Sequence, residues 1–66
     1  MKNNIKMILE DKKISIRKLS KEWGKPYAYT HNLVNREEIS SIPIGTLLEV
    51  ADLLEVDIKD LYVERG

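Results

Sequence analysis

The chain contains no cysteine, which excludes disulfide bonds and thiolate metal sites as sources of stability. No apolar run approaches the roughly 20 residues of a membrane span, and the N-terminus lacks the uninterrupted apolar stretch of a signal peptide. We therefore expect a cytoplasmic protein with no membrane association. With 66 residues, the chain is predicted to form one domain, near the lower limit for folding alone.

The sequence also lacks the residue sets of common enzymes. No Ser, His and Asp residues have the spacing of a catalytic triad, no cysteine is available as a nucleophile, and no glycine-rich loop is present to hold a phosphate. Glu37 and Glu38 are adjacent in a predicted loop, so their carboxylates diverge instead of flanking a substrate. A single histidine without cysteine does not indicate a zinc site. We expect no enzymatic activity, no metal and no cofactor.

Acidic residues are scarce in the first half of the chain and basic residues in the second, although the net charge is zero. Residues 1–36 carry nine basic and three acidic side chains, hence a net charge of +6, whereas residues 37–66 carry two basic and eight acidic ones, hence −6. This division is typical of a molecule with one face that attracts a polyanion. A solvated mosaic of charges without a binding role explains the same counts equally well.

Helical spacing of apolar residues runs through almost the whole sequence, and no alternation typical of strands is present. We predict helices over about 2–12, 16–23, 27–35 and 44–54, with a loop over 35–43. Asp57 and Asp60 resemble a capping box, which predicts a short fifth helix. The first and fourth helices are predicted to bury one face each, made of Ile5, Ile8, Leu9 and Lys12 and of Leu47, Leu48, Val50, Ala51 and Leu54. The fifth contains Ile58, Leu61 and Tyr62.

The second and third predicted helices carry the most informative pattern. Ser15 is predicted to cap the second helix, because a serine hydroxyl accepts from an otherwise unpaired backbone N–H. Gly24 is suited to end that helix and Pro26 to start the next one. A helix-turn-helix needs small or apolar residues where its helices cross, and these positions are filled in register by Leu19, Ser20, Trp23 and Leu33. Residues 15–36 therefore predict a helix-turn-helix with Trp23 in the core.

This pattern resembles the Xre family of phage-repressor and Cro-like helix-turn-helix domains. The resemblance is carried by Ser15-Ile16-x-x-Leu19-Ser20-x-x-Trp23-Gly24, by Tyr29 with Leu33, and by Ile44-x-Thr46-Leu47-Leu48-x-Val50-Ala51-x-x-Leu54-x-Val56-x-Ile58-x-x-Leu61. It covers nearly the whole length. It implies a compact all-α, five-helix, lambda-repressor-like DNA-binding domain over residues 1–66, whose third helix enters the major groove.

Several positions depart from the family pattern. Lys13 stands where the family often has Gly, and a left-handed backbone there costs about 1 kcal/mol. Leu9 and Val34 replace a frequent Arg–Glu pair, so we predict an apolar contact between them. Thr30 and Lys25 stand at positions that are usually aliphatic. We expect the Thr30 hydroxyl to bond a carbonyl one turn back, and Lys25 to bury its stem while its ammonium stays in water.

The third predicted helix has an inward side, made of Thr30, Leu33 and Val34, and an outward side. We predict that the outward residues contact DNA bases: Tyr27, Ala28, His31 and Asn32. An amide such as that of Asn32 can bond adenine at two places, and a solvated amide is the alternative interpretation. Phosphate contacts are predicted from the N-terminus of the second helix and its surroundings, through Ser15, Arg17, Lys18, Lys25, Tyr29, Asn35 and Arg36.

One such module buries little surface for tight specific binding, so we expect a homodimer that reads two half-sites of a DNA operator. The predicted dimer surface consists of Ile58, Leu61, Tyr62 and Val63. The sequence thus predicts a sequence-specific, double-stranded DNA-binding transcriptional regulator, a phage-type or bacterial repressor open to control by a protein antagonist. The alternative is a protein-interaction module, an antirepressor or adaptor whose third helix docks on a protein groove.

Overall fold

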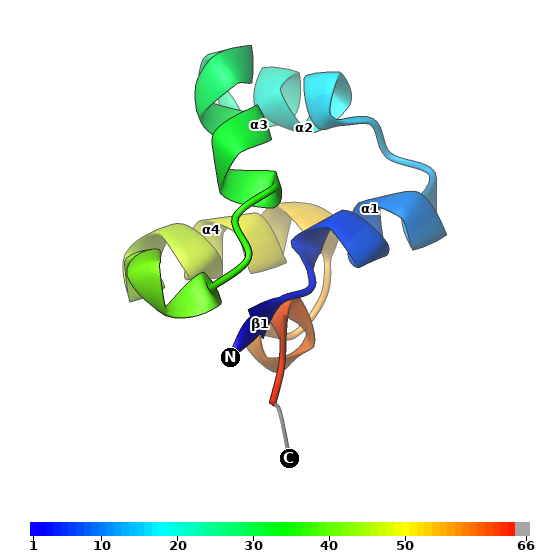
Figure 1. Ribbon diagram of the computed structural model, residues 1–66. Helices are drawn as coiled ribbons and strands as arrows, with labels where there is room; N and C mark the ends of the chain where they lie inside the picture. The colour runs from blue at the N-terminus through cyan, green and yellow to red at the C-terminus, as the bar shows by residue number, and fades with distance from the viewer. Residues whose placement is uncertain (65–66) are drawn as a thin grey trace.

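The computed structural model describes residues 1–64 and places the helix-turn-helix at one end of a mostly helical domain. Figure 1 shows α2 and α3 together at that end, α1 and α4 across the middle, and β1 at the opposite end. The elements follow in the order β1 (Lys2–Asn3), α1 (Ile5–Lys12), α2 (Ile16–Trp23), α3 (Tyr27–Val34), η1 (Ile39–Ser41), α4 (Ile44–Leu54), η2 (Ile58–Leu61) and β2 (Tyr62–Val63).

The all-α class is confirmed, but the predicted count of five helices is wrong, because residues 1–64 contain four α-helices. The segment expected to form the fifth is the 3₁₀ turn η2. Its capping box is present: the Lys59 N–H donates to Asp57 Oδ1 and the Asp57 N–H to Asp60 Oδ2, both at 3.2 Å. The turn stops after Leu61, since Tyr62 enters a strand instead. No helix in residues 1–64 is both long and apolar enough to cross a membrane.

The first helix begins at Ile5 rather than near Lys2, because the chain before it forms β1. This strand pairs antiparallel with β2, with Lys2 opposite Val63 and Asn3 opposite Tyr62. Asn4 precedes the helix without a capping bond from its own side chain, and Asn3 Oδ1 accepts the N–H of the first helical residue, Ile5, at 2.9 Å. Strands of two residues are too short to show an alternating pattern, so they could not be predicted from the sequence.

A single apolar core lies between the helices and holds together elements from both ends of the chain. Leu9 and Val34 are both buried in it, although their predicted direct contact stays a prediction. Leu48 and Lys12 are exposed, contrary to expectation. The buried residues of α4 recur at helical spacing, and Leu48 lies outside this set: Leu47, Val50, Ala51 and Leu54. The core is made of Ile5, Ile8, Leu9, Leu19, Leu33, Val34, Ile39, Ile42, Leu47, Val50, Ala51, Leu54 and Leu61.

Two helices end on a residue with left-handed backbone that is not glycine. Lys13 has φ 59° and ψ 41° after α1, and Glu55 has φ 56° and ψ 45° after α4. In both turns the next residue bonds back into the helix, Ile14 N–H to Leu9 O at 2.9 Å and Val56 N–H to Ala51 O at 3.0 Å. These bonds satisfy otherwise unpaired carbonyls and offset the backbone strain.

Candidate nucleic-acid interface

The second helix starts where the sequence predicts, on a serine cap. Ser15 has an extended backbone, and its Oγ accepts the Lys18 N–H at 3.0 Å. The first turn of α2 contains no acidic residue, and Arg17 and Lys18 are both exposed on it. The N-terminal end of a helix carries a partial positive charge. This end of α2 is therefore electropositive through both its backbone and its side chains.

The turn between α2 and α3 is set by Gly24, Lys25 and Pro26. Gly24 has φ 77°, and its N–H and that of Lys25 both donate to Ser20 O, at 2.9 and 3.1 Å. A Cβ at Gly24 would meet nothing within 4 Å, so glycine is needed for its backbone angle and not for space. Pro26 then leads into α3 from an extended conformation. The turn thus fixes where α3 begins relative to α2.

The inward side of α3 is anchored as predicted. Thr30 is 0% exposed, and its Oγ1 donates to Pro26 O at 3.2 Å. Leu33 and Val34 are buried in the core, and the Asn3 side chain donates to Leu33 O at 3.0 Å. These contacts hold the helix from one side along its length. The four residues predicted to contact bases are all exposed: Tyr27, Ala28, His31 and Asn32.

Trp23 lies at the edge of the core and is half-buried, so its predicted place inside the core is only partly correct. Its ring centroid is 5.7 Å from that of Tyr29, and its Nε1 donates to Glu49 Oε1 at 2.7 Å. The Lys25 ammonium lies 5.9 Å from the Trp23 ring and 6.0 Å from the Tyr29 ring. Lys25 is exposed overall, with its charge beside two aromatic rings.

A second aromatic cluster joins the two helices at their starts. The Arg17 guanidinium carbon lies 5.1 Å from the Tyr27 ring centroid. The Tyr27 ring is in turn 5.8 Å from the His31 ring, tilted by 37°. Tyr27 lies ten positions after Arg17 in the sequence, and no spacing rule pointed to their contact.

The remaining residues of the predicted phosphate set lie around α3 and are exposed. Asn35 follows the helix and donates from Nδ2 to His31 O at 2.9 Å, and Arg36 donates from Nη1 to Ser41 Oγ at 3.2 Å. The structure thus brings Arg17 to Tyr27 and Lys25 to Tyr29, whereas Arg36 lies apart, at the far end of α3. Contact of the predicted base and phosphate sets with DNA stays a prediction.

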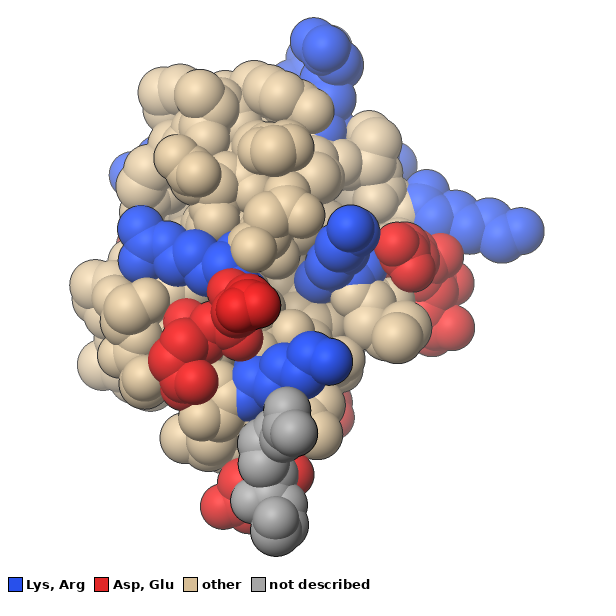
Figure 2. Space-filling view, viewed as in Figure 1, with Lys and Arg blue, Asp and Glu red and all other residues tan. Residues whose placement is uncertain are grey.

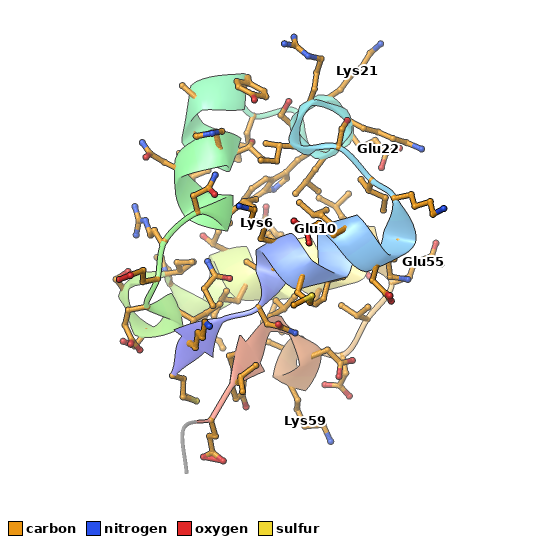
Figure 3. All side chains as sticks on the ribbon, turned by 45° about the vertical axis from the view of Figure 1, so that its right-hand side comes forward. Lys6, Glu10, Lys21, Glu22, Glu55 and Lys59 are labelled. Atoms are coloured by element: carbon orange, nitrogen blue, oxygen red, sulfur yellow. The ribbon has the colours of Figure 1, made fainter. Side chains whose placement is uncertain are left out.

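The helix α3 itself carries no acidic residue, and Glu22 on α2 is an acidic residue at this end of the molecule (Figure 3). The sequence has no acidic residue between Glu22 and Glu37. Figure 2 shows Lys and Arg but no Asp or Glu over the α2–α3 end on the face in view, with acidic groups lower down. In Figure 3, Lys21 projects from α2 at this end, while Lys59 lies at the opposite end of the molecule. Within residues 1–64 the one ion pair joins the Met1 amine to Glu38, so the basic residues near α3 are unpaired.

The predicted dimer surface needs a correction. Leu61 is 0% exposed and belongs to the domain's own core, so it cannot contact a second copy. Ile58 and Tyr62 are half-buried, and Val63 is exposed. The largest exposed apolar side chains outside the helix-turn-helix include Ile44, 65% exposed, and Leu48, 52% exposed. Ile44 borders an apolar groove whose other lining residues are Met1, Ile39, Ser40, Ile42, Leu47, Ile58 and Tyr62.

Comparison with known proteins agrees with this geometry. A family model described as "Cro/C1-type HTH DNA-binding domain" matches residues 4–63. The matched range runs from the residue before α1 to the end of β2, and so takes in the helix-turn-helix and the core that supports it. Neither a curated protein nor a solved structure gives a significant match.

Proposed function

The chain belongs to the Cro/C1-type helix-turn-helix DNA-binding domain family, and we propose that it is a repressor-type transcriptional regulator that reads specific double-stranded DNA sequences. One observation carries the proposal. The third helix is anchored on one side by Thr30, Leu33 and Val34, and its other side is exposed and carries no acidic residue. A helix held in this way is suited to enter a major groove.

In this proposal the exposed side of α3 divides into base contacts and backbone contacts. The Asn32 amide bonds the N6 and N7 edge of an adenine, and Ala28 packs on a thymine methyl group. Tyr27 and His31 complete the base-facing set. The phosphates on either side are contacted from the start of α2, from the turn and from the end of α3, by Ser15, Lys18, Lys25, Tyr29, Asn35 and Arg36.

Two copies of the domain would read an operator with half-sites about one helical turn apart. The apolar groove bordered by Ile44 supports pairing of two copies, because its lining leaves apolar area open to solvent. Val63 and the half-buried Ile58 and Tyr62 lie on the same C-terminal part of the chain. The proposal includes control of the regulator by a protein antagonist in the cytoplasm.

One observation favours a second candidate function, a protein-interaction module. Residues 27–35 contain no Lys, Arg, Asp or Glu and include two exposed tyrosines. Such a surface is also suited to a groove on another protein. Binding to DNA separates the two functions, because an adaptor that docks through α3 would not retain random duplex DNA at low salt.

The test is selection of duplexes from a random-sequence pool at low salt, followed by titration of the selected duplex. We expect Asn32→Ala to weaken binding to that duplex about 5- to 150-fold and to leave binding to random DNA nearly unchanged. Lys59→Ala, at the opposite end of the molecule, is the control and should bind as the unchanged protein does. Failure to enrich any sequence would contradict sequence-specific recognition.

A further inference from the structure

We propose that Arg17 recognises a guanine base, with the Tyr27 ring as the platform that orients its guanidinium. This inference rests on the proposed function and adds a specificity-determining residue to it. From the sequence alone, Arg17 is assigned to phosphate contact, because it lies in the first turn of α2 among other basic residues. Its surroundings in the structure point to a different role.

The geometry places the Arg17 guanidinium at the start of the recognition helix. Tyr27 is the first residue of α3, and the Arg17 Cζ lies 5.1 Å from its ring centroid. The N-terminal residues of a recognition helix are those that contact base edges. Although Arg17 belongs to α2, its guanidinium therefore lies beside the first residue of α3.

The contact with Tyr27 is the interaction that holds the guanidinium. In residues 1–64, Arg17 forms no salt bridge, and its side chain donates no hydrogen bond. The Tyr27 ring is itself restrained by its neighbour on the same helix, His31, at 5.8 Å. Arg17, Tyr27 and His31 form a connected cluster that limits the orientations open to the guanidinium before any ligand arrives.

The chemistry of this arrangement suits guanine. A guanidinium held over a ring keeps the N–H donors along its edge available. Two parallel donors match the O6 and N7 acceptors of guanine in the major groove. The same pair of donors can bond two phosphate oxygens, so the position of the group decides between them: the guanidinium lies at the first residue of α3, where base edges are contacted.

The decisive variant is Arg17→Lys, which keeps the charge and removes the planar pair of donors. We expect it to weaken binding to the duplex selected by the unchanged protein about 5- to 150-fold, with binding to random duplex nearly unchanged. Selection repeated with Arg17→Lys should lose one guanine preference and keep the rest. Lys18→Ala, the neighbouring exposed basic residue, should weaken binding to both duplexes alike.

Tyr27 is tested by two further variants. Tyr27→Phe keeps the ring and should keep the guanine preference, whereas Tyr27→Leu removes the platform and should lower that preference. All five side-chain changes are at exposed positions, and circular dichroism checks that each variant is folded. Equal weakening of both duplexes by Arg17→Lys would overturn the assignment and leave Arg17 a phosphate contact. Equal binding by Arg17→Lys and the unchanged protein, with Arg17→Ala weakening both duplexes alike, would overturn it as well. Failure of the unchanged protein to bind any duplex would overturn the proposed function as well.

Discussion

The indole Nε1 of Trp23 donates a 2.7 Å hydrogen bond to Oε1 of Glu49. This bond joins the last residue of α2 to the middle of α4, and the Trp23 ring also contacts Tyr29 on α3. Three helices therefore meet at one half-buried side chain. The position of the helix-turn-helix relative to the rest of the domain depends on this junction.

We expect Glu49→Ala to lower the free energy of unfolding by about 1 kcal/mol, because the indole N–H loses its carboxylate acceptor. In a domain of this size that corresponds to a fall in Tm of about 4–8 °C. Glu49→Gln should lower the free energy of unfolding by less, since the amide oxygen can still accept the hydrogen bond from the indole N–H. Asp52→Ala, an exposed acidic residue on the same helix, is the control. Equal melting of Glu49→Ala and Asp52→Ala would show that the bond adds no stability.

The left-handed backbones of Lys13 and Glu55 predict that glycine stabilises both positions. Relief of the steric cost is worth about 1 kcal/mol, reduced by the greater freedom of glycine in the unfolded chain. Chemical denaturation of Lys13→Gly and Glu55→Gly measures the gain. Glu10→Gly, at an exposed position inside α1, is the matched control and should lose about 1 kcal/mol. A loss of similar size at Lys13 or Glu55 would contradict the account of these turns.

Two variants of Thr30 compare its hydroxyl and its methyl group as stabilisers of α3. Thr30→Val keeps the shape of the side chain, and the Pro26 carbonyl keeps its bond from the Thr30 N–H at 3.1 Å. We expect a loss of stability below about 1 kcal/mol for this variant. Thr30→Ser keeps the hydroxyl but leaves a buried methyl-sized space, and should cost about 0.5–1.5 kcal/mol. The opposite order, measured by urea denaturation, would mean that the hydroxyl bond dominates.

We expect the ionisation of Glu38 to make the stability of the domain depend slightly on pH. A hydrogen bond from the Met1 ammonium and another from Ser40 lower the pKa of this carboxyl below its usual 4.5. Because the pKa of Glu38 is lower in the folded state, the carboxylate stabilises the folded state above the pKa that it has in the unfolded chain. This stabilisation is lost as the pH falls through the pKa of the folded state. We therefore expect Glu38→Gln to melt below the unchanged protein at pH 7. The two should converge in strong acid, and a constant difference would contradict this account.

The helix-turn-helix could be predicted from the sequence because its determinants are local. Ser15 caps, Gly24 turns and Pro26 starts a helix through their own backbone chemistry, and the structure places each as expected. The buried side of α3 followed from helical spacing for the same reason. The family pattern drew attention to Lys13, which stands where the family often has Gly, and the structure gives it a left-handed backbone.

Other features depend on distant parts of the chain and could not be read from local patterns. The pairing of Asn3 with Tyr62 creates two strands that are too short for any periodic signal. Leu61 and Leu48 are both apolar, but the first is covered by the core and the second faces solvent. The contact of Arg17 with Tyr27 depends on the placement of two side chains across the turn, which spacing alone does not determine.

Titration of the ¹⁵N-labelled protein with its selected duplex, followed by amide chemical shifts, tests most directly that α3 reads DNA. We expect the largest saturable changes over Tyr27–Asn35 and Ser15–Lys18, including the side-chain amide of Asn32. Changes confined to the surface around Ile44 and Leu48, with α3 unaffected, would contradict the central claim.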